Sequence, residues 1–245
     1  MQKYFNNIYN GNFENLILHL EKSIQNEKKE FIITANPEII MKSLNDEEIS
    51  KMLLDHNNII VPDGISIVKA SKKFNKNISE RITGIELSSE LIKLADKYHK
   101  TIYLFGSEEN VVKKLENKIK EEYKNIPQIY VKNGYKKYKN KIINDIQQKK
   151  PDIILVALGV PLQEKIIYEN ISKFEKGIFV GVGGTFDVLS GTKKRAPKIF
   201  IKLNLEWLYR IIKEPKRLKR FYENNIKFYL KVKILAKKER KKNNE

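Results

Sequence analysis

The fold of this chain is decided by the stretch Ile178-Phe179-Val180-Gly181-Val182-Gly183-Gly184-Thr185-Phe186-Asp187. It begins as a continuous apolar run, which is typical of a strand buried on both faces of a parallel sheet. A glycine-rich turn follows the run, and an acidic residue follows the turn. Because open parallel sheets bind ligands at the carboxyl ends of their strands, Asp187 is a candidate binding residue.

Similar apolar runs recur along the chain and alternate with segments of helical periodicity. Besides Ile178–Val182, the predicted strands are Phe31–Thr34, Ile59–Val61, Thr101–Phe105, Gln128–Val131 and Asp152–Leu158. Helices with one apolar face are predicted at Ile65–Lys73, Glu86–Lys100, Glu108–Tyr123 and Tyr135–Lys149. This alternation predicts an α/β fold, a Rossmann-like parallel sheet flanked by helices.

Composition narrows the class of protein. The chain has 245 residues, 41% of them hydrophobic, so it can bury a large core. It contains no cysteine, which excludes disulfides and thiolate metal sites, and its three histidines are scattered. The first residues lack an apolar signal core, and no apolar run approaches the ~20 residues of a membrane span. We therefore expect a cytoplasmic protein whose contact with a membrane is peripheral.

Charge divides the chain into two parts. The whole sequence carries a net charge of +18, of which residues 193–245 contribute +14 from 19 Lys/Arg and 5 acids. Residues 1–192, here called the body, are nearly balanced at +4. We predict that the body is the α/β core and that residues 193–245, the tail, form a basic helical appendage.

The tail has the pattern of two amphipathic helices separated at Glu214-Pro215. Two interpretations stay open, a surface that contacts a membrane or an anionic ligand, or a helix that packs on the body and leaves a solvated basic face. The apolar stripe consists of Leu218, Phe221, Tyr222, Ile226, Tyr229 and Leu230. The basic face consists of Arg210, Lys213, Arg217, Arg220, Lys227 and Lys231.

Polar residues at the ends of the predicted strands indicate a cleft. Thr34 and Asn36 follow the first strand, Asp63 the second and Gln163 the fifth. Plain βα loops explain the neighbouring glycines, but they do not require these polar side chains. The end of the third strand, Gly106-Ser107, has the pattern of a helix start and is interpreted as structural.

Two of these residues have competing local interpretations. Asp63, between Pro62 and Gly64, is either a general base with a pKa raised by burial or the cap of the following helix. Asn36 precedes Pro37, the expected first residue of a helix, and is interpreted first as an N-cap. This role is compatible with ligand binding if the amide hydrogens also face a ligand.

Missing motifs exclude several functions. The chain has neither GxGxxG nor GxxxxGK[ST], so dinucleotide and P-loop sites are not predicted, and no cofactor is expected. It has no Asp-x-Asp pair, so no metal clamp on a diphosphate is predicted. A nucleic-acid-binding protein is the alternative that the charge suggests, but its cations should line the body. A methyltransferase would need a glycine motif after the first strand, where this chain has Thr34-Ala35-Asn36-Pro37.

Together, the ordered motifs resemble one family, the WecG/TagA/CpsF glycosyltransferases. The resemblance covers most of the chain. Its pieces are Thr34-Ala35-Asn36-Pro37, Pro62-Asp63-Gly64-Ile65, Arg81-Ile82-Thr83-Gly84, Leu158–Glu164, Gly181–Asp187, Gly191, Arg195-Ala196-Pro197, Glu206–Arg210 and Glu214-Pro215-Lys216-Arg217. Asn204 stands where this family usually has glycine.

The resemblance implies an inverting, metal-independent transfer of N-acetylmannosamine. The implied donor is a UDP-sugar, and the implied acceptor is polyprenyl-diphosphate-linked N-acetylglucosamine, as in teichoic-acid linkage-unit synthesis. The alternative is another UDP-sugar in a capsule or surface-polysaccharide pathway. The implied general base is Asp63. The residues implied to line the sugar and acceptor pocket are Thr34, Asn36, Arg81 and Gln163. Those implied to contact the nucleotide are Asp187 and Tyr135.

The same resemblance assigns the tail a place at the membrane. Arg210, Arg217 and Arg220 match an appendage that closes over the active site on the inner face of the cell membrane. The anionic membrane surface would be a partner, because juxtamembrane Lys and Arg contribute about 1 kcal/mol each to binding. No nucleic-acid partner is expected. A homo-oligomer is compatible with the sequence, which leaves the oligomeric state open.

Overall fold

The computed structural model of this chain describes residues 1–134 and 139–242. Within these ranges, six parallel strands form one sheet in the order β2-β1-β6-β5-β3-β4. All six strands were predicted, and their ends differ from the prediction by at most two residues. Their bounds are β1 Lys29–Ala35, β2 Asn58–Pro62, β3 Ile102–Gly106, β4 Ile129–Lys132, β5 Ile153–Ala157 and β6 Gly177–Gly181. The predicted α/β class is confirmed.

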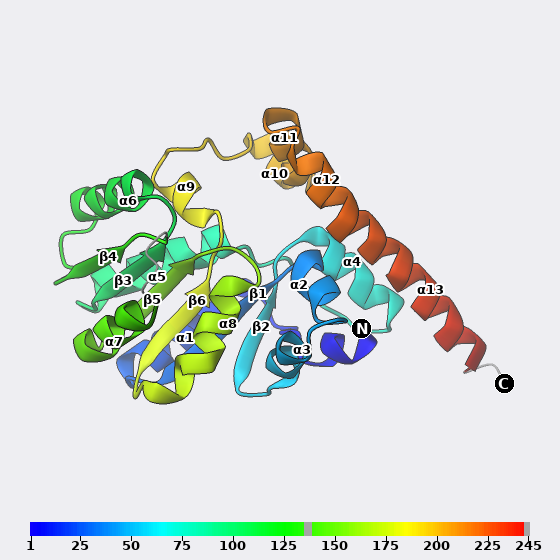
Figure 1. Cartoon of the computed structure of the whole chain (residues 1–245), viewed down its shortest axis with the longest axis horizontal. Helices are drawn as coiled ribbons and strands as arrows, with labels where there is room; N and C mark the ends of the chain where they lie inside the picture. The colour runs from blue at the N-terminus through cyan, green and yellow to red at the C-terminus, as the bar shows by residue number, and fades with distance from the viewer. Residues whose placement is uncertain (135–138, 243–245) are drawn as a thin grey trace.

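Helices connect the strands and cover both faces of the sheet (Figure 1). Those of the body are α1 Phe13–Gln25, α2 Pro37–Lys42, α3 Glu47–Leu54, α4 Ile65–Lys73, α5 Gly84–Lys97, α6 Glu109–Glu122, α7 Lys139–Lys149, α8 Leu162–Asn170 and α9 Thr185–Leu189, with 3-10 turns at Gln2–Asn6 and Ile171–Lys173. Those of the tail are α10 Lys198–Lys202, α11 Glu206–Lys213, α12 Arg217–Phe221, a π turn Tyr222–Ile226 and α13 Lys227–Lys242.

Successive side chains of the strands pack alternately into two apolar cores, one on each face of the sheet. Ile33 and Phe179 face the core shared with α2, α3, α4, α7, α8 and α13. Ile32 and Val180 face the core shared with α1, α5, α6 and α9. Because both faces are covered, the strands are apolar on both sides, as the sequence pattern predicted.

The connections after β1 and β6 leave toward opposite faces of the sheet. The helix after β1, α2, packs in the first core through Ile39, whereas α9, after β6, packs in the second through Phe186. These two strands are neighbours, and such a divergence opens a crevice at their carboxyl ends. The topology therefore places the ligand-binding edge at the ends of β1 and β6.

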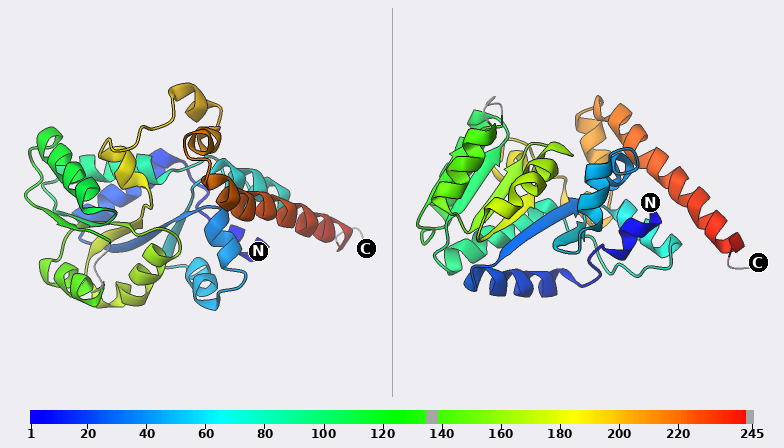
Figure 2. Two further views of the ribbon diagram at one scale, coloured as in Figure 1. Left: turned by 45° about the horizontal axis from the view of Figure 1, so that its top comes forward. Right: turned by 60° about the horizontal axis from the view of Figure 1, so that its bottom comes forward.

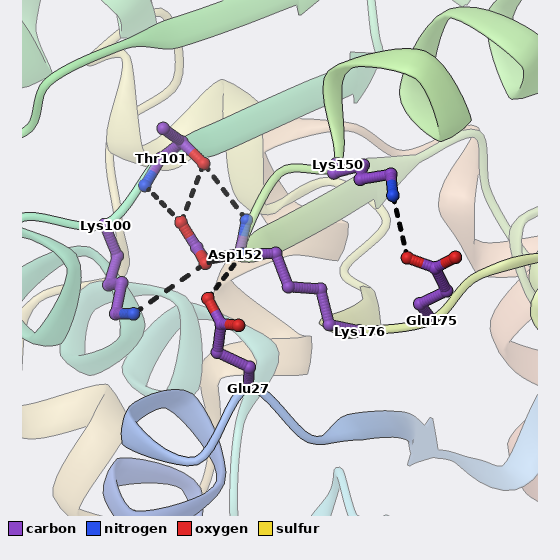
Figure 3. A network of polar contacts seen from close by, with 7 residues as sticks. All are labelled: Glu27, Lys100, Thr101, Lys150, Asp152, Glu175 and Lys176. Atoms are coloured by element: carbon purple, nitrogen blue, oxygen red, sulfur yellow. Dashed lines mark hydrogen bonds and ion pairs between the residues drawn. The ribbon is translucent and has the colours of Figure 1, made fainter.

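A network of hydrogen bonds and ion pairs lies at the opposite edge of the sheet, where the strands begin (Figure 3). Asp152, just before β5, accepts hydrogen bonds from the backbone and hydroxyl of Thr101, both at 2.8 Å, and pairs with Lys176 at 3.0 Å. Lys176 also pairs with Glu27 at 2.8 Å. Burial would raise the pKa of Asp152, but these partners hold it below its ordinary value. The network therefore ties together the starts of β3, β5 and β6.

The tail leaves the body after α9, crosses the carboxyl edge of the sheet and ends in a long helix beside α4 (Figures 1 and 2). The break at Glu214-Pro215 lies between α11 and α12, as predicted. Phe228, Val232 and Ala236 are buried against the body, at 1%, 2% and 5% exposure. The tail thus packs on the body, but through residues outside the predicted apolar stripe.

Candidate active site

A cleft of about 830 Å³ lies between the carboxyl ends of the strands and the tail. This volume is in the range of small-molecule sites. The ends of β1, β2, β5 and β6 contribute to it, whereas the end of β3 is not among its lining residues. Nine of the ten predicted site residues line the cleft: Thr34, Asn36, Asp63, Arg81, Gln163, Asp187, Arg210, Arg217 and Arg220. The tenth, Tyr135, lies outside the described residues.

Asp63 occupies the turn directly after β2. Its backbone N–H donates to Ala35 O at 2.8 Å, so the turn is pinned to the neighbouring strand. The N-cap of α4 is Gly64, at φ +126°, a backbone conformation that favours glycine, and no side chain caps this helix. The interpretation of Asp63 as a helix cap is therefore wrong, and its carboxylate accepts no hydrogen bond from the described residues.

Desolvation dominates the electrostatics of Asp63. The carboxyl is partly exposed to the cleft, but the surrounding protein raises its pKa to about 6. Arg81 and Arg210 act against this shift, whereas Glu206 and Glu86 add to it. A carboxylate with a pKa near 6 is mostly ionised at neutral pH and is a stronger base than an exposed aspartate.

Arg81 reaches this site from the extended segment before α5. Ile82 N–H donates to Pro62 O at 3.0 Å, which places the segment alongside the end of β2. Arg81 Nη2 lies 3.4 Å from Glu206 Oε2, and Glu206 also contacts Arg210. The contact with Arg81 joins the body to the tail, whereas the contact with Arg210 lies within α11.

Glu206 is the site residue that the sequence analysis missed. It is only 7% exposed. The sequence marked it as part of a family motif, but its contact with Arg81 lies 125 positions away and leaves no local signal. Asn204, just before α11, has φ +58°. This left-handed conformation explains why asparagine can stand where glycine is usual.

Asn36 and Thr34 line the cleft and also make hydrogen bonds that stabilise the fold. Asn36 Oδ1 accepts a hydrogen bond from Ile39 N at 3.1 Å, which confirms that Asn36 is the N-cap of α2. Thr34 Oγ1 donates to Gly181 O at 2.8 Å and so joins β1 to β6. Within the described residues, the Asn36 amide N–H groups and the Thr34 oxygen lone pairs remain available to a ligand.

Gln163 joins two of the loops that form the cleft. Its Oε1 accepts hydrogen bonds from Gly159 N at 3.0 Å and Gly183 N at 2.9 Å, and its Nε2 donates to Glu164 at 2.6 Å. A Cβ atom on Gly181 would lie 2.8 Å from Gln163 Nε2, so a larger residue at this strand position would displace the Gln163 side chain. Glu164 is fully buried, and this burial raises its pKa to about 7.

Acidic residues pair with the cations of the tail around the cleft. Glu214 pairs with Lys193 at 3.1 Å and with Arg217 at 2.7 Å. Arg220 pairs with Glu38 of α2. Asp187 lies 3.8 Å from Lys193. The predicted arginines are therefore in the cleft, but each is held by a carboxylate of the protein itself.

Trp207 and Phe221 form the apolar wall of the cleft on the tail side. Their rings stack with centroids 4.4 Å apart and planes 10° apart. The other members of the predicted apolar stripe face outward, with 38% to 59% exposure: Leu218, Tyr222, Ile226, Tyr229 and Leu230. Arg210, Lys213, Arg217 and Arg220 of the predicted basic face line the cleft, whereas Lys227 and Lys231 are exposed on α13.

In residues 1–134 and 139–242, no three His, Cys, Asp or Glu side chains gather as they would around a metal ion. None of the helices in these ranges combines the length and apolar character that a membrane span requires.

Comparison with known proteins identifies one family. The model of the "Glycosyl transferase WecG/TagA/CpsF family" matches residues 4–244. The chain is 40% identical, over 86% of its length and 82% of the relative, to an N-acetylglucosaminyldiphosphoundecaprenol N-acetyl-beta-D-mannosaminyltransferase from Bacillus subtilis (strain 168). Relatives of the same name are 35% identical in Bacillus spizizenii, over 83% of this chain and 79% of the relative, and 38% identical in Staphylococcus aureus (strain MW2), over 78% and 74%.

Proposed function

Because this chain belongs to the WecG/TagA/CpsF family of glycosyltransferases, we propose that it transfers N-acetylmannosamine from UDP-N-acetylmannosamine to N-acetylglucosamine on a polyprenyl diphosphate. The transfer inverts the anomeric centre and needs no metal ion. It builds the linkage unit of teichoic acid. The proposal rests on one observation above all: a desolvated carboxylate, Asp63, faces a cleft into which the tail brings several arginines.

Asp63 acts as the general base. It removes the proton from the acceptor hydroxyl as that oxygen attacks the anomeric carbon of the donor sugar. The bond from this carbon to the β-phosphate oxygen breaks, and UDP leaves with the electron pair. A single attack of this kind inverts the configuration, and its base must be ionised, which a pKa of about 6 permits at neutral pH.

Cations of the tail stabilise the leaving diphosphate. Arg217 and Arg220 line the cleft, and their present partners, Glu214 and Glu38, are carboxylates that a diphosphate can replace. Fixed positive charges at the point where negative charge develops are a major source of catalysis. They do here what a metal ion does in other transferases, so the proposed reaction is metal-independent.

The other predicted residues orient the two substrates. Asn36 and Thr34 offer amide donors and hydroxyl lone pairs to the sugars, while Gln163 holds the loops that surround them. Asp187 contacts the nucleotide, and Tyr135 is assigned to the nucleotide by the family resemblance alone.

The tail also brings the enzyme to its lipid-linked acceptor. Its outward side combines exposed apolar residues with lysines, and such a surface binds anionic membranes. We place the enzyme on the inner face of the cell membrane, with no nucleic-acid partner.

A UDP-release assay tests this function. The enzyme is given a panel of UDP-sugars with a short-chain lipid-diphosphate N-acetylglucosamine, and each donor is also tested without acceptor. We expect acceptor-dependent release of UDP from UDP-N-acetylmannosamine. Release from a different UDP-sugar alone would place the enzyme in a capsule or another surface-polymer pathway, and no acceptor-dependent release from any donor would refute the transferase assignment.

A further inference from the structure

Glu206 is buried although it belongs to the largely exposed tail. It is the first residue of α11 and has only 7% exposure. One carboxylate oxygen lies 3.4 Å from Nη2 of Arg81, which comes from the body, and the other contacts Arg210, one turn later in α11. A buried carboxylate is costly unless it is paired, and this one is paired on both sides.

Both arginines held by Glu206 act on the same carboxyl group. Four charged groups act on the Asp63 carboxyl: Arg81 from the segment before α5, Arg210 and Glu206 from α11, and Glu86 from α5. Arg81, Arg210 and Glu206 also line the same cleft as Asp63. Glu86 is itself engaged by Arg195 at 2.9 Å and by the Thr83 hydroxyl at 2.7 Å. The tail therefore reaches this environment twice, through Glu206 and Arg210 of α11 and through Arg195, which pairs with Glu86.

The net charge of the Arg81–Glu206–Arg210 group is equal and opposite to that of the ionised base. Two guanidiniums and one carboxylate carry a net charge of +1, which balances one ionised Asp63. Without Glu206 the two guanidiniums would repel each other and would present +2 to Asp63. Asp63 would then hold its negative charge more easily and would be a weaker base.

We propose that Glu206 is a positioning residue that holds Arg81 and Arg210 beside Asp63 and so makes the general base depend on the docked tail. This inference rests on the proposed function, in which Asp63 removes the acceptor proton. Glu206 itself touches neither substrate nor the reacting atoms in this scheme. It acts through its own negative charge, which raises the pKa of Asp63, and through the two arginines that it holds.

The test compares Glu206→Gln with Glu223→Gln. Both variants remove one negative charge from the tail, but Glu223 is exposed on the π turn and does not line the cleft. For Glu206→Gln we expect the plateau of kcat/KM to fall at least about tenfold, since misplaced catalytic groups cost this much or more. We also expect the acid limb of its pH profile to move to lower pH. Glu223→Gln should match the wild type in both.

A measurement without turnover separates this inference from the proposed function. The side-chain carboxyl of Asp63, labelled with ¹³C and assigned by its loss in Asp63→Asn, is titrated by NMR in the full chain. We expect a lower midpoint in Glu206→Gln than in the wild type and Glu223→Gln. Circular dichroism verifies that each variant is folded.

Equal midpoints in all three folded proteins would overturn the role of Glu206, whatever the assay shows. Conversely, a wild type that transfers no sugar would refute the proposed function, while the titration would still decide whether Glu206 controls Asp63. If Glu206→Gln fails to fold, Arg210→Gln is titrated in its place. Because Arg210 favours the ionised form of Asp63, its loss should raise the midpoint, and an unchanged midpoint would again overturn the inference.

Discussion

Arg220 and Glu38 join the tail to the body through two hydrogen bonds. Arg220 Nε and Nη2 both donate to Glu38 Oε2, at 3.0 and 2.7 Å. Glu38 lies in α2, directly after the end of β1, and Arg220 lines the same cleft. The contact therefore holds a tail cation over the proposed site until an anionic ligand competes for it.

The double variant Arg217→Ala, Arg220→Ala tests the role of these cations. We expect kcat on a soluble acceptor to fall roughly 10- to 100-fold, because stabilisation of the leaving diphosphate is lost. Lys219→Ala is the matched control, since Lys219 is exposed in the same helix and does not line the cleft. Full kcat in the double variant would show that these arginines do not assist the leaving group.

Asp63→Asn separates catalysis from stability. Loss of a positioned base should lower the rate about 10²–10⁴-fold. The folded pKa of Asp63, about 6, exceeds the ordinary 3.8, so its ionisation weakens the fold as pH rises through this interval. The variant escapes this penalty, and we expect its Tm at pH 8 to equal or exceed that of the wild type. For the wild type, kcat/KM should fall below about pH 6.

Two outcomes would contradict this prediction. An Asp63→Asn enzyme that turns over within about threefold of the wild type would remove Asp63 from the mechanism. A Tm that falls at pH 8 would show that the carboxylate stabilises the fold instead of straining it.

Gly181→Ala should destabilise the protein far more than Gly184→Ala. The new methyl group at position 181 would meet Gln163 and Glu164 at 2.8 to 3.0 Å, whereas the nearest atom to a Cβ at position 184 is 3.9 Å away. Overpacking of this kind costs about 1–3 kcal/mol. Urea unfolding of both variants checks the difference, and equal midpoints would mean that the Gln163 side chain moves away without cost.

Asp152→Asn should destabilise the fold at neutral pH and lose this effect in acid. The folded pKa of Asp152 lies below its ordinary value of 3.8, so its ionised form contributes stability above that value. The contribution disappears as pH falls through the lowered pKa. Urea unfolding at pH 7 and near pH 3 tests this. A difference between variant and wild type that is undiminished at the lower pH would assign the effect to geometry.

Transfer should survive chelation. With arginines in place of a metal ion, EDTA should leave the rate of UDP release unchanged. A loss of activity that Mg²⁺ or Mn²⁺ restores would refute the metal-independent mechanism. A dialysed sample without chelator is the control for handling losses.

Local sequence patterns predicted the strands and the polar residues at their ends, whereas Arg81 and the tail arginines were assigned to the site by the family resemblance. The strands are short apolar runs, and polar residues such as Asn36 and Asp63 follow them, so a parallel sheet gathers these residues at one edge. The strand order was not predicted. β1 pairs with β6, nearly 150 positions later, and such a pairing leaves no local mark.

The missed features depend on distant partners or on a choice between two faces. Glu206 is buried because Arg81 reaches it from the body. In α13, the spacing of Phe228, Val232 and Ala236 by four residues marks an apolar face. The prediction instead chose the larger stripe that begins at Leu218, most of which is exposed. The cap interpretation of Asp63 failed because Gly64 occupies the N-cap position itself.

The π turn Tyr222–Ile226 sets the angular phase of the long terminal helix. Cleft residues such as Phe221 precede it, and the residues that pack on the body, beginning with Phe228, follow it. A residue of an α-helix turns the chain by about 100°. Removing one residue from this turn would therefore leave a regular helix in which the cleft residues and the body-packing residues no longer keep their present relative directions. Either the arginines would point away from the cleft, or the terminal helix would no longer pack against α4. The π turn therefore lets one continuous helix direct its first part toward the cleft and its last part toward the body, which a uniform α-helix could not do.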